Sequence, residues 1–211
     1  MKQFILLFAL LLTAPMAFAQ LDFNPATIEI SAGVPLITKP NEGLARSNYA
    51  TFSNFSGGLR YMFNTNYGLK GNYTYTNFSD KDNSEFGNEH HRVSLEGVAQ
   101  LGNLLNFHHS FRRHWGLLAH AGLGMTWASP EQITEYERIG NLIFGLTPEF
   151  KISEQFSIIG DASYIVNMSQ NFGYDGTPVV SGSDHVTGSY FQMNIGVQWH
   201  FGNKKTAADW H

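Results

Sequence analysis

Residues 67–79 read YGLKGNYTYTNFS, and this stretch decides the fold because apolar and polar side chains alternate along it. Small and polar residues, namely Gly68, Lys70, Asn72 and Thr74, occupy one set of alternate positions. The other set is largely aromatic or aliphatic and consists of Tyr67, Leu69, Tyr73 and Tyr75, with Gly71 as a gap. A period of two predicts a β-strand rather than an amphipathic helix.

The same alternation recurs along most of the chain. It predicts eight strands, over residues 26–37, 51–64, 67–79, 90–103, 115–128, 139–153, 156–169 and 188–202. Each segment is long enough for a tilted strand that crosses a bilayer. We therefore predict an all-β fold, an eight-stranded antiparallel transmembrane up-and-down β-barrel, over residues 20–202.

Residues 1–19 form a separate segment. Lys2 precedes an apolar run over residues 4–12, and Ala17, Phe18 and Ala19 supply an A-x-A cleavage pattern. These features predict a secretory signal peptide. The run is short for a transmembrane anchor, which needs about 20 apolar residues. The chain has no Cys, which excludes a lipoprotein anchor, a disulfide framework and a thiol nucleophile.

Alternation alone does not decide which face points inward, so a soluble barrel with an apolar interior, as in lipocalins, remains an alternative. Two observations favour the membrane barrel. The polar face is mostly small and uncharged, which suits a narrow filled interior. Aromatic residues also gather near both strand ends, as membrane girdles do. They are Phe63, Tyr67, Trp115, Phe150, Phe156, Trp199 and Phe201 at one end, and Tyr75, Phe78, Trp127, Tyr164 and Tyr190 at the other.

Short and long connections alternate, which is typical of outer-membrane barrels. Only Thr65 and Asn66 join the second and third segments, and only Glu154 and Gln155 join the sixth and seventh. With eight strands, both termini are predicted to be periplasmic and the longer connections to face outward. One periplasmic link, residues 104–114, breaks the rule by its length. We expect it to form a short helical turn against the inner membrane face.

Three stretches resemble the N-terminal transmembrane domain of the outer-membrane protein A family. They are GGLRYMFNTNYGLKGNYTY, LGNLLNFHHSFRRHWGLLAHAGLGM and TPEFKISEQFSIIGDASYI, at residues 57–75, 101–125 and 147–165. The resemblance implies a structural protein of the Gram-negative cell outer membrane that supports envelope integrity, with possible narrow porin-like conductance. Residues 203–211 are similar to the linker that precedes a peptidoglycan-binding domain in that family. We assign them to a C-terminal periplasmic tail or linker remnant, so peptidoglycan is an expected partner only of a longer form.

The inward positions carry four acids and four bases, which are Glu29, Arg60, Lys70, Arg92, Glu96, Glu149, Lys151 and Asp161. Charges inside a narrow barrel must be paired to offset their desolvation. We therefore predict a lumen charge network, with His120 and His200 as polar neighbours. The resemblance implies that such a network could gate a narrow channel; a purely structural plug remains the alternative.

Composition and motifs argue against other site chemistries. With 13 basic and 17 acidic residues and a formal charge of −4, the chain lacks the cationic excess that nucleic acids attract. The histidine pairs at residues 90–91 and 108–109 do not fit the H-E-x-x-H zinc pattern. Asp80, Asp82, Asn83 and Glu85 lack the spacing of a calcium loop. We expect no catalytic, cofactor or metal site.

Two further functions stay open as alternatives. A lipid A-modifying barrel enzyme would need an outer nucleophile and base, for which His185, Thr187 and Ser189 form the only candidate cluster. An adhesin or receptor could use residues 175–186, which are rich in Gly, Ser and Pro. The expected partners are outer-membrane lipid and lipopolysaccharide and the barrel-assembly machinery, and we expect a monomer.

Overall fold

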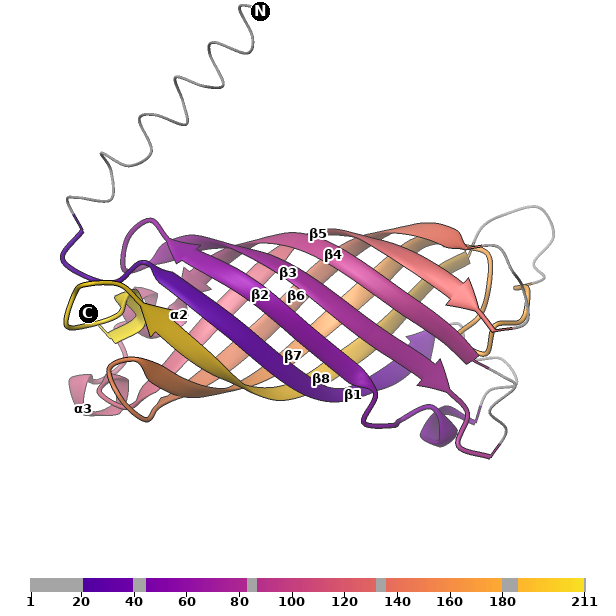
Figure 1. The fold of residues 1–211 in the computed structure, drawn as a ribbon, viewed down its shortest axis with the longest axis horizontal. Helices are drawn as coiled ribbons and strands as arrows, with labels where there is room; N and C mark the ends of the chain where they lie inside the picture. Colours follow the sequence, from indigo (N-terminus) through magenta and orange to yellow (C-terminus); the bar gives the residue numbers. More distant parts are fainter. Residues whose placement is uncertain (1–20, 40–44, 83–86, 132–135, 180–185, 211) are drawn as a thin grey trace, which may run out of the picture.

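The chain forms a closed eight-stranded barrel in which every strand pairs antiparallel with its neighbours in sequence and β1 pairs with β8 (Figure 1). The computed structural model describes residues 21–39, 45–82, 87–131, 136–179 and 186–210. The predicted signal peptide, Asn83, Glu85 and His185 lie outside the described residues. The predicted fold class is confirmed.

The strands follow the predicted segments closely. They are β1 Ala26–Lys39, β2 Asn54–Met62, β3 Tyr67–Ser79, β4 Gly87–Gln100, β5 Trp115–Pro130, β6 Glu137–Lys151, β7 Phe156–Gln170 and β8 Val186–Phe201. The main differences are that β2 begins three residues late and that β4 is shifted by three residues toward the N-terminus. The fourth predicted strand ran to residue 103, but a short helix, α2 (Leu101–Leu104), begins directly after Gln100.

Apolar side chains point outward and polar side chains point into the barrel. On β4, Leu95 is 61% exposed while its neighbours Ser94 and Glu96 are buried. On β5, Leu123 is 65% exposed and Thr126 is buried. A polar interior inside an apolar outer wall is the reverse of the lipocalin arrangement, so the soluble alternative does not describe this barrel.

The aromatic residues of one predicted girdle all point outward, including Tyr67, Trp115 and Trp199. The other predicted girdle was partly wrong, because Phe78 is 0% exposed and Tyr190 is 1% exposed. The reason is strand parity. Phe78 lies an odd number of residues after outward-facing Tyr75, so its side chain points into the barrel.

Both ends of the described chain meet at the same end of the barrel, which we call the terminal end. Asn24 and Ala207 form a parallel bridge there, and Figure 1 shows α2, α3 (His109–Arg112) and the C-terminus at this end. The expected helical turn in the long link is thus present as two short helices. The opposite, distal end carries the 3-10 helix η1 (Arg46–Asn48). No helix in the described ranges is long and apolar enough to cross a bilayer.

Candidate functional site in the barrel interior

Arg60 is the centre of a buried charge cluster near the terminal end. Its Nε donates to Glu29 Oε1 at 2.7 Å, and its Nη2 donates to Glu149 Oε1 at 3.3 Å. Its two terminal nitrogens also donate to the two carboxylate oxygens of Asp209, at 2.5 and 2.9 Å. One guanidinium therefore holds three carboxylates, from β1, from β6 and from the C-terminal segment, by the forked geometry that arginine provides.

Lys70 extends this cluster toward the middle of the barrel. Its Nζ lies 2.9 Å from Glu29 Oε2, so the Glu29 carboxylate bridges Lys70 and Arg60. Gln198 Nε2 donates to Glu29 Oε1 at 3.1 Å. The register explains the proximity, because Arg60 and Lys70 are direct partners on β2 and β3. The carboxylate between them relieves the repulsion of two facing cations.

A second cluster lies around His120. Its Nδ1 is 2.6 Å from Glu96 Oε2 and its Nε2 is 3.0 Å from Asp161 Oδ2, so the ring joins β4 to β7 across the interior. Gly145 makes room for the ring, because a Cβ at this position would collide with His120 Nε2. Hydroxyl groups of Ser94, Thr147 and Ser163 donate to the same two carboxylates.

Two of the predicted network residues lie apart from these clusters. Arg92 sits nearer the distal end, where its guanidinium donates to Tyr190 Oη at 2.6 Å and to Gln192 Oε1 at 2.8 Å rather than to a carboxylate. Lys151 is the last residue of β6, and its Nζ pairs with the exposed Glu154 at 2.8 Å. The structure thus joins Glu29, Arg60, Lys70 and Glu149 in one cluster and Glu96 and Asp161 in another.

Asp209 is the member of the Arg60 cluster that sequence reasoning missed. Residues 203–210, assigned above to a tail or linker remnant, turn back into the terminal end of the barrel. Two backbone bonds hold them there, from Asn24 N to Thr206 O at 2.8 Å and from Ala208 N to Asn24 O at 3.1 Å. One feature of the sequence could have predicted that this segment is buried, namely Ala207, Ala208 and Trp210 around a single acid. Small and aromatic residues favour burial.

With Asp209 included, the two clusters hold five acids, against the permanent cations Arg60 and Lys70 within them and Arg92 beyond them. His120, which lies between two carboxylates, is a buried group that can supply further positive charge. His120 contacts two carboxylates, whereas His200 Nδ1 lies 3.6 Å from Asp209 Oδ2 and hydrogen-bonds Thr27. Both histidines are therefore members of the network rather than polar neighbours.

Apolar side chains close the interior on both sides of the charged clusters. At the terminal end the layer consists of Phe23, Met62, Val98, Leu118 and Ala208. At the distal end it consists of Ile37, Tyr49, Phe78, Ile143, Ile165, Tyr174 and Tyr190. A cavity between the layers, lined by Lys70, Glu96 and Asp161 among others, measures about 10 Å³, which is space for a single water.

Tyr174 reaches the distal layer from the connection between β7 and β8. Gly176, at φ 78°, turns this connection back, and Asn88 Nδ2 donates to Gly173 O at 3.1 Å. The Tyr174 ring packs 4.6 Å from Phe78, centroid to centroid. Burial, with Tyr190 close by, raises the pKa of Tyr174 well above its usual value, so the phenol stays neutral.

The other residues considered in the sequence analysis are dispersed. His90 is buried against Phe78, while His91 points outward against Tyr75. Within the described ranges, no group of three or more His, Cys, Asp or Glu is arranged to hold a metal ion. Ser189 Oγ hydrogen-bonds Thr38 Oγ1 at 2.9 Å, and its proposed base His185 lies outside the described residues.

Comparison with solved structures finds the same barrel in proteins of very different sequence. Neisserial surface protein A matches with a TM-score of 0.56 at 9% identity, covering 83% of this chain and 97% of that one. A major outer membrane protein from Thermus thermophilus matches with a TM-score of 0.55 at 10% identity, covering 84% and 98%. The fold is that of a small outer-membrane barrel. No protein-family model and no curated protein sequence matches the chain.

Proposed function

We propose that the protein is a structural β-barrel of the bacterial outer membrane, similar in role to the transmembrane domain of the outer-membrane protein A family, and that it stabilises the cell envelope. The observation that carries the proposal is the filled interior. Buried ion pairs occupy the middle, an apolar layer closes each end, and the cavity between them admits about one water. Transport would require these layers to rearrange, whereas a structural role does not.

The outer wall supports the membrane location. Its middle carries large exposed apolar side chains, such as Leu95, Leu123 and Ile195, and the terminal end carries outward aromatic residues. An apolar belt bordered by aromatic residues is the surface that a bilayer requires. In this placement the terminal end faces the periplasm, the distal end faces the cell exterior, and lipopolysaccharide covers the outer half of the wall.

Deletion of the gene tests the structural role. Cells without the protein are expected to become more sensitive to detergent and to large antibiotics that an intact outer membrane excludes, and the wild-type chain should restore resistance. The Leu95→Arg chain is the matched control and should not restore resistance. A charge at mid-strand on the lipid face costs roughly 2–4 kcal/mol and impairs insertion. Unchanged sensitivity in the deletion strain would contradict an envelope-stabilising role.

Protease accessibility in intact cells tests the orientation. Trypsin is expected to cut at exposed Lys81, in the distal connection between β3 and β4, and to spare Arg112 and Arg113 at the terminal end. After permeabilisation of the outer membrane, both arginines should become cleavable. Fragment masses measured by mass spectrometry distinguish the sites, and cleavage at Arg112 in intact cells would reverse the proposed topology.

A further inference from the structure

The long link between β4 and β5 is strongly basic. It carries Arg112 and Arg113 together with the histidines at positions 108, 109 and 114, and the sequence has no acidic residue between Glu96 and Glu131. Within the described part of the chain, neither arginine lies within ion-pair distance of a carboxylate. The link therefore presents uncompensated positive charge at the terminal end of the barrel.

Aromatic side chains tie this link to the outer wall. The rings of Phe107 and Phe111 lie 5.9 Å apart, Phe111 stacks on Trp115 at 6.1 Å, and Trp115 contacts Phe150 at 4.9 Å. Trp115 and Phe150 belong to the outward aromatic residues of the barrel, and Leu105 in the link is 62% exposed. The link thus continues the apolar wall, and its exposed apolar side chains lie beside its cations.

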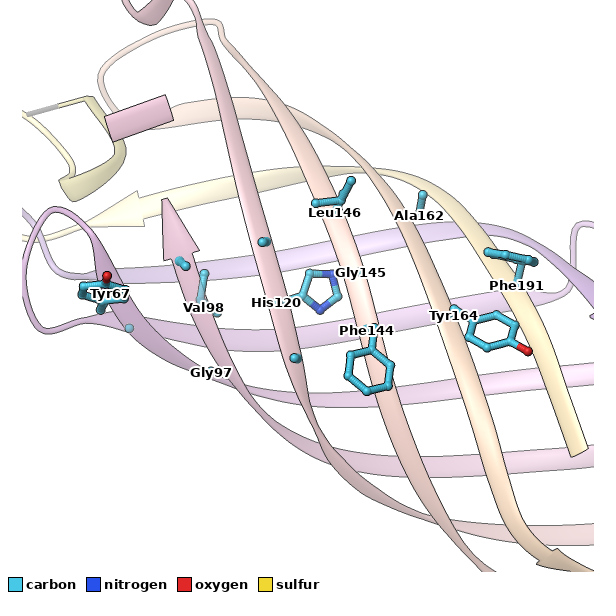
Figure 2. A pocket seen from close by; sticks show the side chains of 14 residues that line it. Tyr67, Gly97, Val98, His120, Phe144, Gly145, Leu146, Ala162, Tyr164 and Phe191 are labelled. Carbon is cyan, nitrogen blue, oxygen red and sulfur yellow. The ribbon is translucent and has the colours of Figure 1, made fainter. Parts of the chain in front are cut away.

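An apolar groove of about 690 Å³ lies on the barrel wall, and its lining includes residues of β4 and β5, the two strands that the link joins (Figure 2). Small residues of β4 and β5 form its floor, namely Gly97, Ala99, Ala119 and Ala121, and the larger Tyr67 and Phe144 border it. The floor belongs to the two strands that the link joins. Register pairs Gly97 with Ala121 and Ala99 with Ala119, so the bare backbone of Gly97 and three outward alanine methyl groups form one continuous depression.

We propose that the groove and the link together bind an anionic phospholipid of the periplasmic leaflet, such as phosphatidylglycerol. An acyl chain lies along the groove floor, and the phosphate is held by Arg112 and Arg113 at the level of the aromatic residues. The inference rests on the proposed membrane location. A lipid fits better than a protein partner because the groove is continuous with the lipid-facing wall and because basic residues beside a membrane surface attract anionic headgroups.

Native mass spectrometry of the purified full chain in non-ionic detergent tests the proposal, with dioleoyl phosphatidylglycerol and dioleoyl phosphatidylcholine as probes. Each arginine near a headgroup contributes about fivefold to affinity, so Arg112→Gln with Arg113→Gln is expected to weaken phosphatidylglycerol binding roughly 30-fold. Binding of the zwitterionic lipid should hardly change. The matched control is Lys204→Gln with Lys205→Gln, which removes the same charge at the same end and should change affinity less than about twofold.

Filling the groove supplies an independent variant. A side chain at Gly97 would have Ala121 O at 3.8 Å from its Cβ as its nearest neighbour, and one at Gly71 has nothing within 4 Å. A Cβ therefore fits at both positions, and both positions are exposed on the outside of the barrel. Gly97→Leu is expected to reduce binding of both lipids, whereas Gly71→Leu, on the wall of β3, should not.

Three results would overturn the inference. The first is equal binding of the two lipids by the wild-type chain. The second is a loss of phosphatidylglycerol affinity in the Lys204/Lys205 control equal to that in the arginine variant. The third is a wild-type dimer that Gly97→Leu dissociates, because the groove would then be a contact between copies. Insertion into phosphatidylcholine vesicles, followed by heat-dependent gel migration, separates this inference from the proposed function. A chain that inserts but shows no lipid preference refutes the lipid site alone, and a chain that does not insert refutes the membrane location.

Discussion

A barrel with Arg60→Met is expected to lose at least about 3–5 kcal/mol of unfolding free energy, which is the usual cost of leaving a buried charge without its partner. The side chain of Arg60 is fully buried and contacts three carboxylates, so its removal leaves Glu29, Glu149 and Asp209 facing one another. Lys70 still compensates Glu29, but it reaches neither of the other two within ion-pair distance. Urea unfolding in vesicles, followed by tryptophan fluorescence, measures the loss.

Lys151→Met is the matched control for Arg60→Met. The Lys151 side chain is 16% exposed, but its partner Glu154 is 55% exposed, so solvent screens the pair and its contribution is expected to be at most about 1 kcal/mol. Adding Asp209→Asn to Arg60→Met should recover part of the stability, because it removes one of the repelling carboxylates. Equal stabilities of the Arg60 and Lys151 variants would contradict the buried cluster.

Strand parity explains how much could be predicted from the sequence. A side-chain period of two assigns each residue of a strand to the inside or the outside, and the eight predicted charges were identified from this pattern alone. The same rule places Phe78 and Tyr190 inside. Their assignment to an aromatic girdle was wrong because it used their position along the strand and ignored the face on which they lie.

Contacts across the interior could not be predicted in the same way. Whether His120 on β5 also meets Asp161 on β7 depends on the stagger between strands that are not neighbours, which the alternation of one chain does not contain. Arg92 was grouped with the other charges for this reason, although its partners are Tyr190 and Gln192. Asp209 was missed for a different reason, because it lies beyond the last strand and no periodicity applies to it.

The two apolar layers change what the charge network is expected to do. If the charge network were the one barrier in the barrel, breaking it would open the barrel to ions. In this structure Tyr174 and its neighbours close the distal end, and Met62, Ala208 and their neighbours close the terminal end. Breaking an ion pair between these layers removes one of three barriers to ions, so stability and conductance should respond differently.

Glu96→Ala is therefore expected to destabilise the barrel by about 3–5 kcal/mol without opening a channel. Glu96 is buried, accepts from Ser94 at 2.6 Å and pairs with His120 at 2.6 Å, so its loss leaves the imidazole with Asp161 as its one carboxylate partner. Urea unfolding in vesicles measures the destabilisation. Planar-bilayer recordings should show no conductance steps until Tyr174→Ala and removal of residues 203–211 are added to the same variant.

Glu154→Gln is the control for Glu96→Ala, since it removes an exposed carboxylate from a surface pair and should change neither stability beyond about 1 kcal/mol nor conductance. Conductance steps from Glu96→Ala alone would show that the charged layer is the one barrier and that the apolar layers leak. Absence of conductance steps in the combined variant would show that the remaining polar side chains, chiefly Arg60 and Lys70, still fill the interior. Because ions need a continuous hydrated path, the smallest combination of changes that produces conductance steps identifies the layers that close the barrel.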